Sequence, residues 1–375
     1  MNNINVKGLN ECSGCTVCKL ACPTNAIDMK FNTKGFFEPK VNLDKCVDCG
    51  LCKKVCYKYF DVSKYKGNNI KDTKTYAMWN TNEKIRLESS SGGVCTEIIK
   101  YAIKNEYNVI GCTYNTEKKI AEHIIIENEN DIYKIIGSKY LQSNFSNILD
   151  IINLKKKYVI IGTPCQIYGI KELVKSKKKE KNFIFIDFFC HGIPSYNLWN
   201  KYINQVVKVK IEKINFREKS NGWHDFCINI NNGEYKKDNK EDLFFKAFLS
   251  NLCLNNSCYN CKFRFNKIYS DIRLGDFWGE EYKCDKKGVS IVVTSNDKGE
   301  EVLDSISENF LKKEEKNFNS LKKSQYHGET LYKPDKKEIF EKSLIEETIL
   351  KDDIDFALKR NIFEKVFSRL RRVFR

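Results

Sequence analysis

Apolar residues follow two different periodicities along the chain. From about Thr75, short runs rich in β-branched and aromatic residues alternate with stretches of helical spacing, which predicts an α/β or α+β domain. The runs that predict buried strands are residues 109–110, 124–126, 158–161 and 183–189. Helical spacing of Ile98, Ile99, Ala102 and Ile103 predicts a helix directly after residues 89–93. No stretch approaches eighteen consecutive apolar residues, so no membrane-spanning helix is expected.

The two ends of the chain have patterns of their own. Residues 1–62 predict a small domain of two short βαβ-like halves, joined by a hairpin over residues 31–41 that contains Gly35 and Pro39. Residues 63–69 are polar and predict a linker. After the central domain the pattern becomes mainly helical and lysine-rich. The expected parts are therefore a ferredoxin-like domain at 1–62, a mixed α/β domain at 75–298 and a helical extension at 299–375.

The C-terminal segment, residues 361–375, has a basic amphipathic pattern. Its apolar residues at helical spacing are Ile362, Phe363, Val366, Phe367, Leu370, Val373 and Phe374. Its basic residues on the other face are Lys365, Arg369, Arg371 and Arg372. Such a helix can lie on an anionic membrane surface, or it can dock on its own domain with the basic residues near its C-terminal dipole. The docked helix is the favoured interpretation, and peripheral membrane contact is the alternative.

The chain is strongly basic, with 65 Lys and Arg against 49 Asp and Glu and a formal net charge of +16. The lysines are scattered in short runs such as 155–157 and 177–179, which indicates solvated faces. No helix-turn-helix pattern, RNP motif or zinc finger accompanies them. We therefore expect no nucleic-acid partner. A basic surface suits an acidic electron carrier or an anionic cofactor.

Eight cysteines fall into two matching runs, each with the spacing C-x2-C-x2-C-x3-C. The runs are Cys12, Cys15, Cys18 and Cys22, then Cys46, Cys49, Cys52 and Cys56. In bacterial ferredoxins with two [4Fe–4S] clusters, the fourth cysteine of such a run binds the other cluster. The resulting assignment is Cys12, Cys15, Cys18 and Cys56 for one cluster, and Cys46, Cys49, Cys52 and Cys22 for the second. Pro23 follows the first run as this pattern expects, whereas Tyr57 replaces proline after the second, which alters the turn and not the ligands.

Two other uses of cysteine fit these runs less well. A disulfide framework is typical of small secreted domains, whereas this chain is long and shows no export signal. Zinc sites usually pair two C-x2-C knuckles across a longer gap, but each run here packs four cysteines into eleven residues. The segment therefore predicts one-electron transfer, and the many free cysteines predict a reducing cytoplasm.

Beyond this segment, seven short motifs follow one another along the chain. They are SSSGGVCTEI (89–98), GSKYLQS (137–143), IGTPCQIYGIK (161–171), DFFCHGIPS (187–195), SCYNCKF (257–263), SDIRLGDFWG (270–279) and KGVSIVV (287–293). This ordered set resembles the coenzyme F420 hydrogenase/dehydrogenase beta-subunit family over roughly residues 75–300, and a ferredoxin segment is a common companion in that family. The resemblance implies a flavoprotein that holds FAD, exchanges electrons through iron–sulfur clusters and moves two electrons as hydride. It implies coenzyme F420 or another conjugated ring as acceptor, and relatives also occur among bacterial gene sets for surface polysaccharides.

Three of the motifs supply candidates for holding the flavin. The cofactor-binding candidates are Ser90, Ser91, Gly92, Gly93, Ser138, Lys139 and Thr163. The Ser/Gly loop at 89–93 precedes a helix and offers backbone amides and a positive dipole end to a pyrophosphate, although a serine-capped helix without a ligand is the alternative. Lys139 can pair a phosphate or stabilise a reduced flavin ring, or it can be an ordinary surface lysine. No G-x-G-x-x-G follows a predicted strand, so a Rossmann site is not indicated.

Four further cysteines are candidates for a third cluster beside the flavin, as the resemblance implies. They are Cys165, Cys190, Cys258 and Cys261. The first two follow predicted strands, at the sheet edge where α/β sites form, and the last two make one C-x2-C. The alternative is that they are buried cysteines that act as small apolar residues.

Two histidines are candidate proton donors, because reduction of a substrate by a flavin needs a proton beside each hydride. They are His191 and His224, and the alternative for each is a satisfied polar residue. Asp276, Phe277 and Trp278 can pack against a flavin or another bound ring, although the aromatic residues are more typical of a core.

These patterns together predict a cytoplasmic iron–sulfur flavoprotein oxidoreductase. Electrons are expected to pass between ferredoxin or another redox subunit, two or three [4Fe–4S] clusters and FAD, with hydride transfer to or from a small organic acceptor. Lys139 and His191 are the catalytic candidates. Two alternatives stay open: an electron-transfer subunit whose substrate site lies on a partner chain, and a cluster-binding protein without flavin. The sequence sets neither the direction of electron flow nor the substrate.

Overall fold

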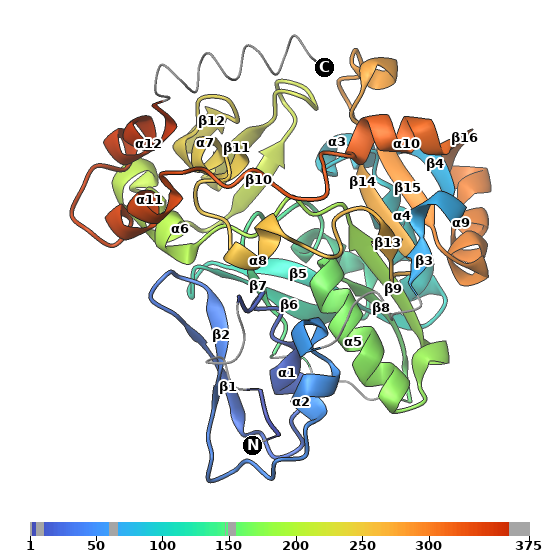
Figure 1. Ribbon diagram of the computed structural model, residues 1–375. Coiled ribbons are helices and arrows are strands. Elements are labelled where there is room, and N and C mark those ends of the chain that lie inside the picture. The colour runs from blue at the N-terminus through green and yellow to red at the C-terminus, as the bar shows by residue number, and fades with distance from the viewer. Residues whose placement is uncertain (1, 5–10, 60–66, 147, 149–154, 360–375) are drawn as a thin grey trace.

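A nine-stranded mixed sheet forms the centre of the molecule in the computed structural model, which describes residues 2–4, 11–59, 67–146, 148 and 155–359 (Figure 1). Across the sheet the strands are β16 (Leu311–Lys316), β4 (Lys74–Asn80), β15 (Ser290–Thr294), β14 (Ile272–Asp276), β9 (Phe183–Phe188), β8 (Lys157–Ile161), β5 (Tyr107–Asn115), β6 (Ile120–Ile126) and β7 (Ser143–Asn144). The central strands β14, β9, β8 and β5 are parallel to their neighbours within this group. This result confirms the predicted mixed α/β class. The first three predicted strand runs lie within β5, β6 and β8, and the run 183–189 extends one residue beyond β9.

Helices cover both faces of this sheet because its strands alternate their side chains. In β9, Ile184 and Ile186 join a core that contains residues of α4 (Val94–Lys104) and α9 (Asp297–Phe310). Phe183 and Phe185 join a second core on the opposite face, which contains residues of α5 (Pro164–Ser176). The predicted helix after residues 89–93 is therefore α4, and its apolar stripe packs on the sheet.

A second layer of structure packs against one end of the sheet. It contains a three-stranded antiparallel sheet and several helices: β10 (Ile214–Glu218), β11 (Cys227–Ile230), β12 (Tyr235–Asp238), α6 (Tyr196–Tyr202), α7 (Leu243–Leu249), α8 (Asn256–Tyr259), α11 (Lys337–Ser343) and α12 (Leu350–Leu358). Their apolar faces form one aromatic-rich core in which the rings of Trp199 and Phe244 lie 5.2 Å apart. This layer supplies the wall that faces the ends of the central strands.

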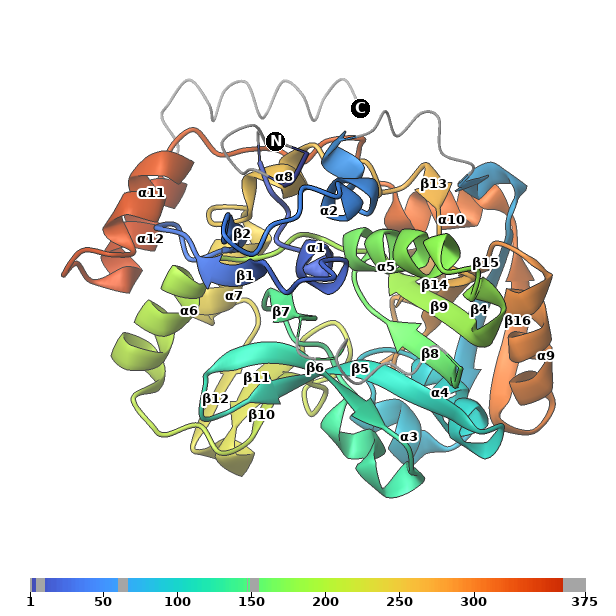
Figure 2. The same ribbon diagram turned by 90° about the horizontal axis from the view of Figure 1, so that it is seen from below.

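The N-terminal segment lies below the central sheet in Figure 1, and Figure 2, which is seen from that side, shows its first helix, α1 (Val17–Leu20), beside α5. Its other described elements are β1 (Ile27–Phe31), β2 (Phe37–Val41) and α2 (Leu51–Lys54). The predicted hairpin is confirmed, because β1 and β2 pair in antiparallel register. Gly169 in α5 allows close packing, since a Cβ there would lie 3.1 Å from Val17. The amide of Phe37 also donates to Gln142 Oε1 at 2.7 Å, so both α1 and β2 are attached to the larger domain.

The C-terminal part differs from the prediction of a separate helical region. Helix α9 packs on the central sheet and β16 pairs with β4, so the sheet continues to residue 316. The remaining elements are α3 (Glu83–Glu88), β3 (Asn68–Asn69), β13 (Lys267–Ile268) and α10 (Phe318–Gln325). Because β3 pairs with β13, part of the predicted linker is a strand. The basic amphipathic segment at 361–375 lies outside the described residues.

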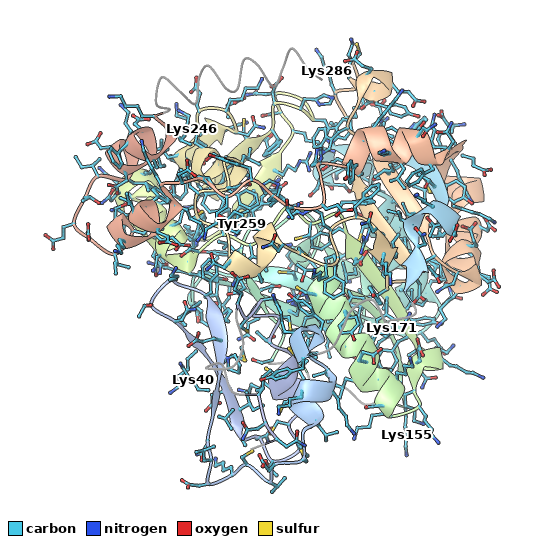
Figure 3. All side chains as sticks on the ribbon, viewed as in Figure 1. Lys40, Lys155, Lys171, Lys246, Tyr259 and Lys286 are labelled. Atoms are coloured by element: carbon cyan, nitrogen blue, oxygen red, sulfur yellow. The ribbon has the colours of Figure 1, made fainter. Side chains whose placement is uncertain are left out.

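The positive charge is spread around the molecule. Figure 3 shows Lys40, Lys155 and Lys286 on separate sides, each on a different element or loop. This distribution agrees with solvated faces rather than one nucleic-acid-binding patch. Within the described part of the chain, no helix combines the length and the apolar character needed to cross a membrane.

Candidate functional site

The N-terminal cysteines form two groups that exchange their fourth members. Burial, followed by the charge of Cys56, raises the pKa of Cys15 to about 12. Burial and the charges of Cys15, Cys12 and Cys56 raise the pKa of Cys18. In the second group, burial raises the pKa of Cys52, and the nearby Cys22 and Cys49 add to it. Each fourth cysteine thus lies near the other run, which is the arrangement that the cluster assignment requires.

Backbone amides point at several of these sulfurs. The amide nitrogens of Gly14, Ile4 and Ala26 lie 3.3, 3.2 and 3.2 Å from the Sγ atoms of Cys12, Cys52 and Cys22. Such donors stabilise thiolate charge, so the residues present fit iron–sulfur clusters. Among the described residues, no three His, Cys, Asp or Glu side chains surround a point suited to a single metal ion. Each cysteine of a [4Fe–4S] cluster binds a different iron, so the cluster assignment depends on the spacing and on this proximity.

The four later cysteines also share one neighbourhood. Burial raises the pKa of Cys190 to about 12, and the charges of Cys165 and Cys261 contribute to the rise. Burial has the same effect on Cys258, with contributions from Cys190 and Cys261. We call Cys165, Cys190, Cys258 and Cys261 the inner cysteine set. Its members come from the start of α5, the loop after β9, and α8 with the loop that follows it.

Tyr57 connects the inner cysteine set with the N-terminal segment. Its side chain is buried and packs against Phe263, with the ring centroids 4.8 Å apart, and against Tyr168. Cys15 is the first of the neighbouring charges that raise the pKa of Cys165, after burial. The inner cysteine set therefore lies beside the first N-terminal group, with Tyr57 at the contact. This residue occupies the position where the ferredoxin pattern has proline.

A pocket of about 660 Å³ opens at the carboxyl ends of β8, β9 and β14. Ligands of open α/β sheets bind at such strand ends. All four histidines of the chain line it: His123, His191, His224 and His327. Six of the seven predicted cofactor-binding residues also line it, namely Ser90, Ser91, Gly93, Ser138, Lys139 and Thr163. Cys190 lines the pocket as well, so the inner cysteine set adjoins it.

The Ser/Gly loop reaches the pocket through Ser90 and Gly93. Ser90 Oγ accepts a hydrogen bond from the amide of Ser138 at 2.8 Å, which joins two of the predicted motifs. Gly93 is the N-cap of α4 with φ 86°, a backbone conformation that favours glycine. The first amides of α4 have no partner within the helix and can donate to an anion. The loop therefore fits the pyrophosphate of a flavin nucleotide.

The predicted role of Gly92 in this loop needs correction. Its amide donates to Ser290 Oγ at 2.9 Å, and its carbonyl accepts from the amide of Asn80. A Cβ at this position would lie 2.4 Å from the carbonyl oxygen of Met78. Gly92 is therefore required for packing against the sheet, and its amide is not free for a ligand.

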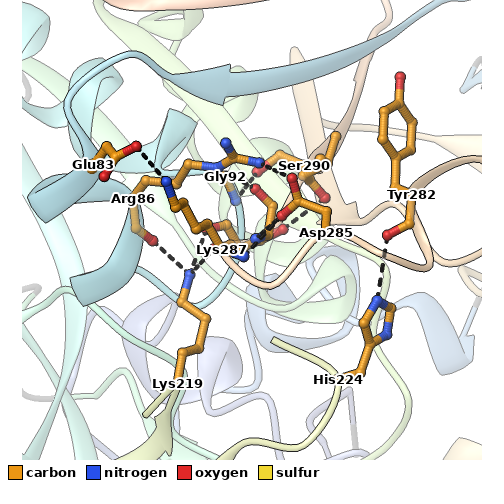
Figure 4. A network of polar contacts seen from close by, with 12 residues as sticks. Glu83, Arg86, Gly92, Lys219, His224, Tyr282, Asp285, Lys287 and Ser290 are labelled. Carbon is orange, nitrogen blue, oxygen red and sulfur yellow. Dashed lines mark hydrogen bonds and ion pairs between the residues drawn. The ribbon is translucent and has the colours of Figure 1, made fainter. Parts of the chain in front are cut away.

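Lys219 fixes the outer side of the same loop, as Figure 4 shows. Its buried Nζ donates to the carbonyl oxygens of Ser91 at 2.9 Å, Arg86 at 2.5 Å and Lys287 at 2.5 Å. Burial lowers the pKa of Lys219 to about 7, and the charge of Arg217 adds to this effect. Arg86 is itself paired with Asp285 at 2.7 Å. This network joins β10 to the Ser/Gly loop.

Lys139 lies within the pocket wall rather than on the surface. Its Nζ donates to the carbonyl oxygens of Ile136 and Gly137 at 2.8 and 3.2 Å. Burial lowers its pKa to about 8 although the thiols of Cys112 and Cys95 lie nearby. The alternative of an ordinary surface lysine is thus excluded, and the group can place a positive charge beside a bound ring.

The other predicted site residues divide between the pocket and the core. Burial, together with the Arg264 charge, lowers the pKa of His191 to about 4, so the ring is neutral at pH 7. Trp278 lines the pocket and stacks on Trp223 with ring centroids 4.9 Å apart, whereas Phe277 is buried in the core. Asp276 pairs with Arg217 at 2.5 Å.

Comparison with known proteins agrees with this geometry. Residues 11–58 match the 4Fe-4S dicluster domain, while residues 75–150 and 155–317 match the N-terminal and C-terminal parts of the coenzyme F420 hydrogenase/dehydrogenase beta subunit. The chain belongs to this family. Its two family segments together cover more than half of the chain and contain the whole Ser/Gly loop, Lys139 and the inner cysteine set.

The relatives are distant. An uncharacterised protein of Methanocaldococcus jannaschii, MJ1349, is 25% identical over 330 residues, which cover 78% of this chain and 85% of that protein. The coenzyme F420-dependent sulfite reductase of the same organism is 23% identical over 314 residues, 79% of this chain and 46% of that enzyme. This chain thus spans less than half of the reductase. A chain of the F420-reducing [NiFe] hydrogenase complex from Methanosarcina barkeri matches with a TM-score of 0.49 and 16% identity, over 78% of this chain and 91% of that chain.

Several residues that line or support the pocket could not be predicted from the sequence. They are Lys219, Arg217, Arg264, His123 and His327. None belongs to a recognisable local motif for a cofactor, although Arg264 follows the SCYNCKF motif directly. The histidine count offers one usable signal. The chain has only four histidines and all of them line one pocket, so the imidazole groups that could transfer protons are concentrated there.

Proposed function

We propose that this chain is an iron–sulfur flavoprotein oxidoreductase that carries electrons between N-terminal [4Fe–4S] clusters and FAD. The observation that supports the proposal is the continuity of its sites. The first N-terminal cysteine group adjoins the inner cysteine set across Tyr57, and Cys190 of that set lines the pocket. When bound, the clusters supply one-electron transfer and FAD supplies two-electron hydride transfer.

The residues of the pocket fit FAD by their chemistry. The amides at the start of α4 and the hydroxyls of Ser90 and Ser138 would hold the pyrophosphate. Lys139 would place its positive charge against a reduced ring, because it is buried and its Nζ donates to the backbone carbonyl oxygens of Ile136 and Gly137. His191 and His224 are candidates for holding or passing a proton, and both line the pocket. The proposed acceptor is coenzyme F420 or another small conjugated ring.

The second N-terminal cysteine group is the proposed entry point for electrons. Cys49 is exposed, and the neighbouring Val47 and Leu43 are 63% and 57% exposed. In the first group, in contrast, Cys18 is buried, and Cys12, Cys15 and Cys56 are only partly exposed. A ferredoxin or a redox subunit can therefore approach the second group more closely than the first. This surface also supports the second candidate function, an electron-transfer subunit whose substrate site lies on a partner chain.

Iron and flavin content of protein purified without oxygen tests the proposal. Two clusters correspond to about eight iron atoms per chain and three to about twelve. About twelve iron atoms with one flavin is the expected result. The Cys190→Ser variant should then lose about four iron atoms. The control Cys284→Ser, at an exposed cysteine outside all three cysteine groups, should lose none.

Two results would contradict parts of the proposal. Iron without flavin, even after reconstitution with FAD, would leave a cluster-binding protein and remove the oxidoreductase assignment. Flavin reduction by the isolated chain without turnover of coenzyme F420 or a small quinone would favour the electron-transfer subunit.

A further inference from the structure

Lys219 is a buried lysine that lies behind the pocket wall and is bonded to it (Figure 4). Its Nζ carries three N–H groups, and the carbonyl oxygens of Arg86, Ser91 and Lys287 accept from them at 2.5, 2.9 and 2.5 Å. These oxygens belong to α3, to the Ser/Gly loop and to the loop before β15. One ammonium group therefore joins three segments of the domain at a single point.

Ser91 is the residue through which Lys219 can affect the pocket. Its Oγ donates to the carbonyl oxygen of Val289 at 2.9 Å, while its own carbonyl oxygen accepts from Lys219. Ser90, which precedes it, lines the pocket, and Gly93, two residues later, is the N-cap of α4. Because these residues are adjacent in the chain, a shift of Ser91 would move the hydroxyl and the amides that the proposed function assigns to the pyrophosphate.

The loop before β15 fits closely against the same serine. Gly288 has φ 103°, and a Cβ there would lie 3.0 Å from the carbonyl oxygen of Ser91. Asp285 Oδ1 accepts from the amides of Lys287 and Gly288 at 2.9 and 2.6 Å, and its Oδ2 pairs with Arg86 at 2.7 Å. The three acceptors of Lys219 are thus held by other contacts, and they form a preformed site for an ammonium group.

We propose that Lys219 is a positioning residue, whose ammonium group holds the Ser/Gly loop in the form that binds the diphosphate of a nucleotide cofactor. The inference rests on the proposed function for the identity of that cofactor, FAD. It adds a residue that does not touch the cofactor but determines its affinity. A lysine with a purely structural role would instead stabilise the fold and leave the affinity unchanged.

The charge of Lys219 gives this inference a pH signature. The charged groups on the elements around it are Arg217, Asp276, Arg86, Asp285 and the surface pair of Glu83 and Lys287. Burial, followed by the charge of Arg217, lowers the pKa of Lys219 to about 7, and the two aspartates offset this only in part. A neutral amine has two N–H donors for three carbonyl oxygens, and a bound diphosphate favours the charged form. The affinity for a diphosphate should therefore fall as the pH rises above 7.

Calorimetric titration of the full chain, purified without oxygen and freed of flavin, tests the inference. The probes are FAD and ADP, which carries a diphosphate without the flavin ring. At about pH 6, Lys219→Met should bind both probes about tenfold more weakly than wild type, because the loop loses a charged hydrogen-bond donor. Lys219→Arg should recover part of this loss, since it keeps the charge and the donors.

Lys201→Met is the matched control. Lys201 is also buried, and its Nζ donates to the carbonyl oxygens of Ser343 and Glu346 in the second layer. Its removal should lower the free energy of unfolding in urea and leave both affinities at the wild-type value. Between about pH 6 and 8, the affinity of wild type for ADP should fall more than that of Lys219→Met. Lys139 titrates in the same range in both proteins, so the difference between them measures Lys219.

Equal affinities of wild type and Lys219→Met for both probes overturn the inference and leave the proposed function intact. A loss of affinity that Lys201→Met shares also overturns it, because the effect is then general destabilisation. If Lys219→Met does not fold, the pH profile of Lys139→Met decides, and an ADP affinity that stays constant overturns the inference. ADP binding that depends on Lys219 in a protein that binds no FAD supports the inference and contradicts the proposed function separately. No measurable binding of either probe by wild type overturns both.

Discussion

Replacement of Tyr57 tests whether the N-terminal segment is joined to the inner cysteine set at one aromatic contact. The Tyr57 side chain is 4% exposed and its ring packs edge-on against Phe263 and Tyr168. Tyr57→Ala removes the whole ring from a site enclosed by two domains. Truncation of a large buried aromatic residue typically costs 3–5 kcal/mol, so we expect a loss of about 4 kcal/mol in the free energy of unfolding.

Tyr57→Phe is the matched control for this change. It keeps the ring and its contacts and removes only the hydroxyl, so the expected loss is about 1 kcal/mol. Urea unfolding followed by tryptophan fluorescence measures both variants. Hydrogen exchange of α1 and the start of α5 measures whether the two parts separate locally, because exchange reports opening of individual elements.

The two measurements together can refute the reasoning. If Tyr57→Ala unfolds within about 1 kcal/mol of wild type and α1 keeps its protection, Tyr57 does not hold the segment in place. If stability falls but flavin reduction through the N-terminal clusters keeps its rate, the contact is structural and the electron route does not depend on it. If Tyr57→Phe lowers the free energy of unfolding as much as Tyr57→Ala does, the hydroxyl and not the ring stabilises the contact.

Three further predictions concern two buried charged residues and one exposed thiol. Burial lowers the pKa of Lys139 to about 8, so between pH 8 and 10 the native state binds fewer protons than the unfolded state and stability from this group rises with pH. Lys139→Met should remove that rise, as urea midpoints across this range would show, and an unchanged slope would contradict it. Asp187→Asn should cost about 3–5 kcal/mol, because it leaves Arg273 buried without its anion, and a change below 1 kcal/mol in urea unfolding would argue against the pair. Cys49→Ser should slow reduction by ferredoxin more than reduction by dithionite, measured by stopped flow, and an equal slowing would exclude the proposed entry point.

The sequence predicts those features that local spacing determines. The cysteine runs could be recognised because all ligands of a run lie within eleven residues, and the hairpin between them follows from its turn residues. The strands β5, β6, β8 and β9 were predicted because buried strands require continuous apolar runs. β16, in contrast, is largely composed of Lys and Glu and lies at the edge of the sheet, so its sequence lacks the apolar signal of a buried strand.

The pocket depends on the order of strands in the sheet, which no local pattern contains. His123 lies on β6 and His327 follows α10, about two hundred residues later, and only the tertiary fold brings both to the same pocket. Lys219 illustrates the same limit. It follows β10 directly in sequence, yet its partners are carbonyl oxygens of α3 and of two distant loops. Gly92 shows the opposite error, because a motif glycine next to a ligand loop serves packing instead.

The exposure and neighbours of the three cysteine groups suggest the order in which electrons would pass through them in the proposed function. The second N-terminal group reaches the surface at Cys49, whereas the first group has no exposed cysteine. The inner cysteine set adjoins both the first group and the pocket. A protein partner is too large to enter the pocket, and a small acceptor gains most binding where a ring can be enclosed. The two ends of this series of sites therefore suit different partners: a redox protein at Cys49 and a small conjugated ring in the pocket. Electrons that pass between these two partners must cross from the first N-terminal group to the inner cysteine set, and Tyr57 lies at the contact between those two groups.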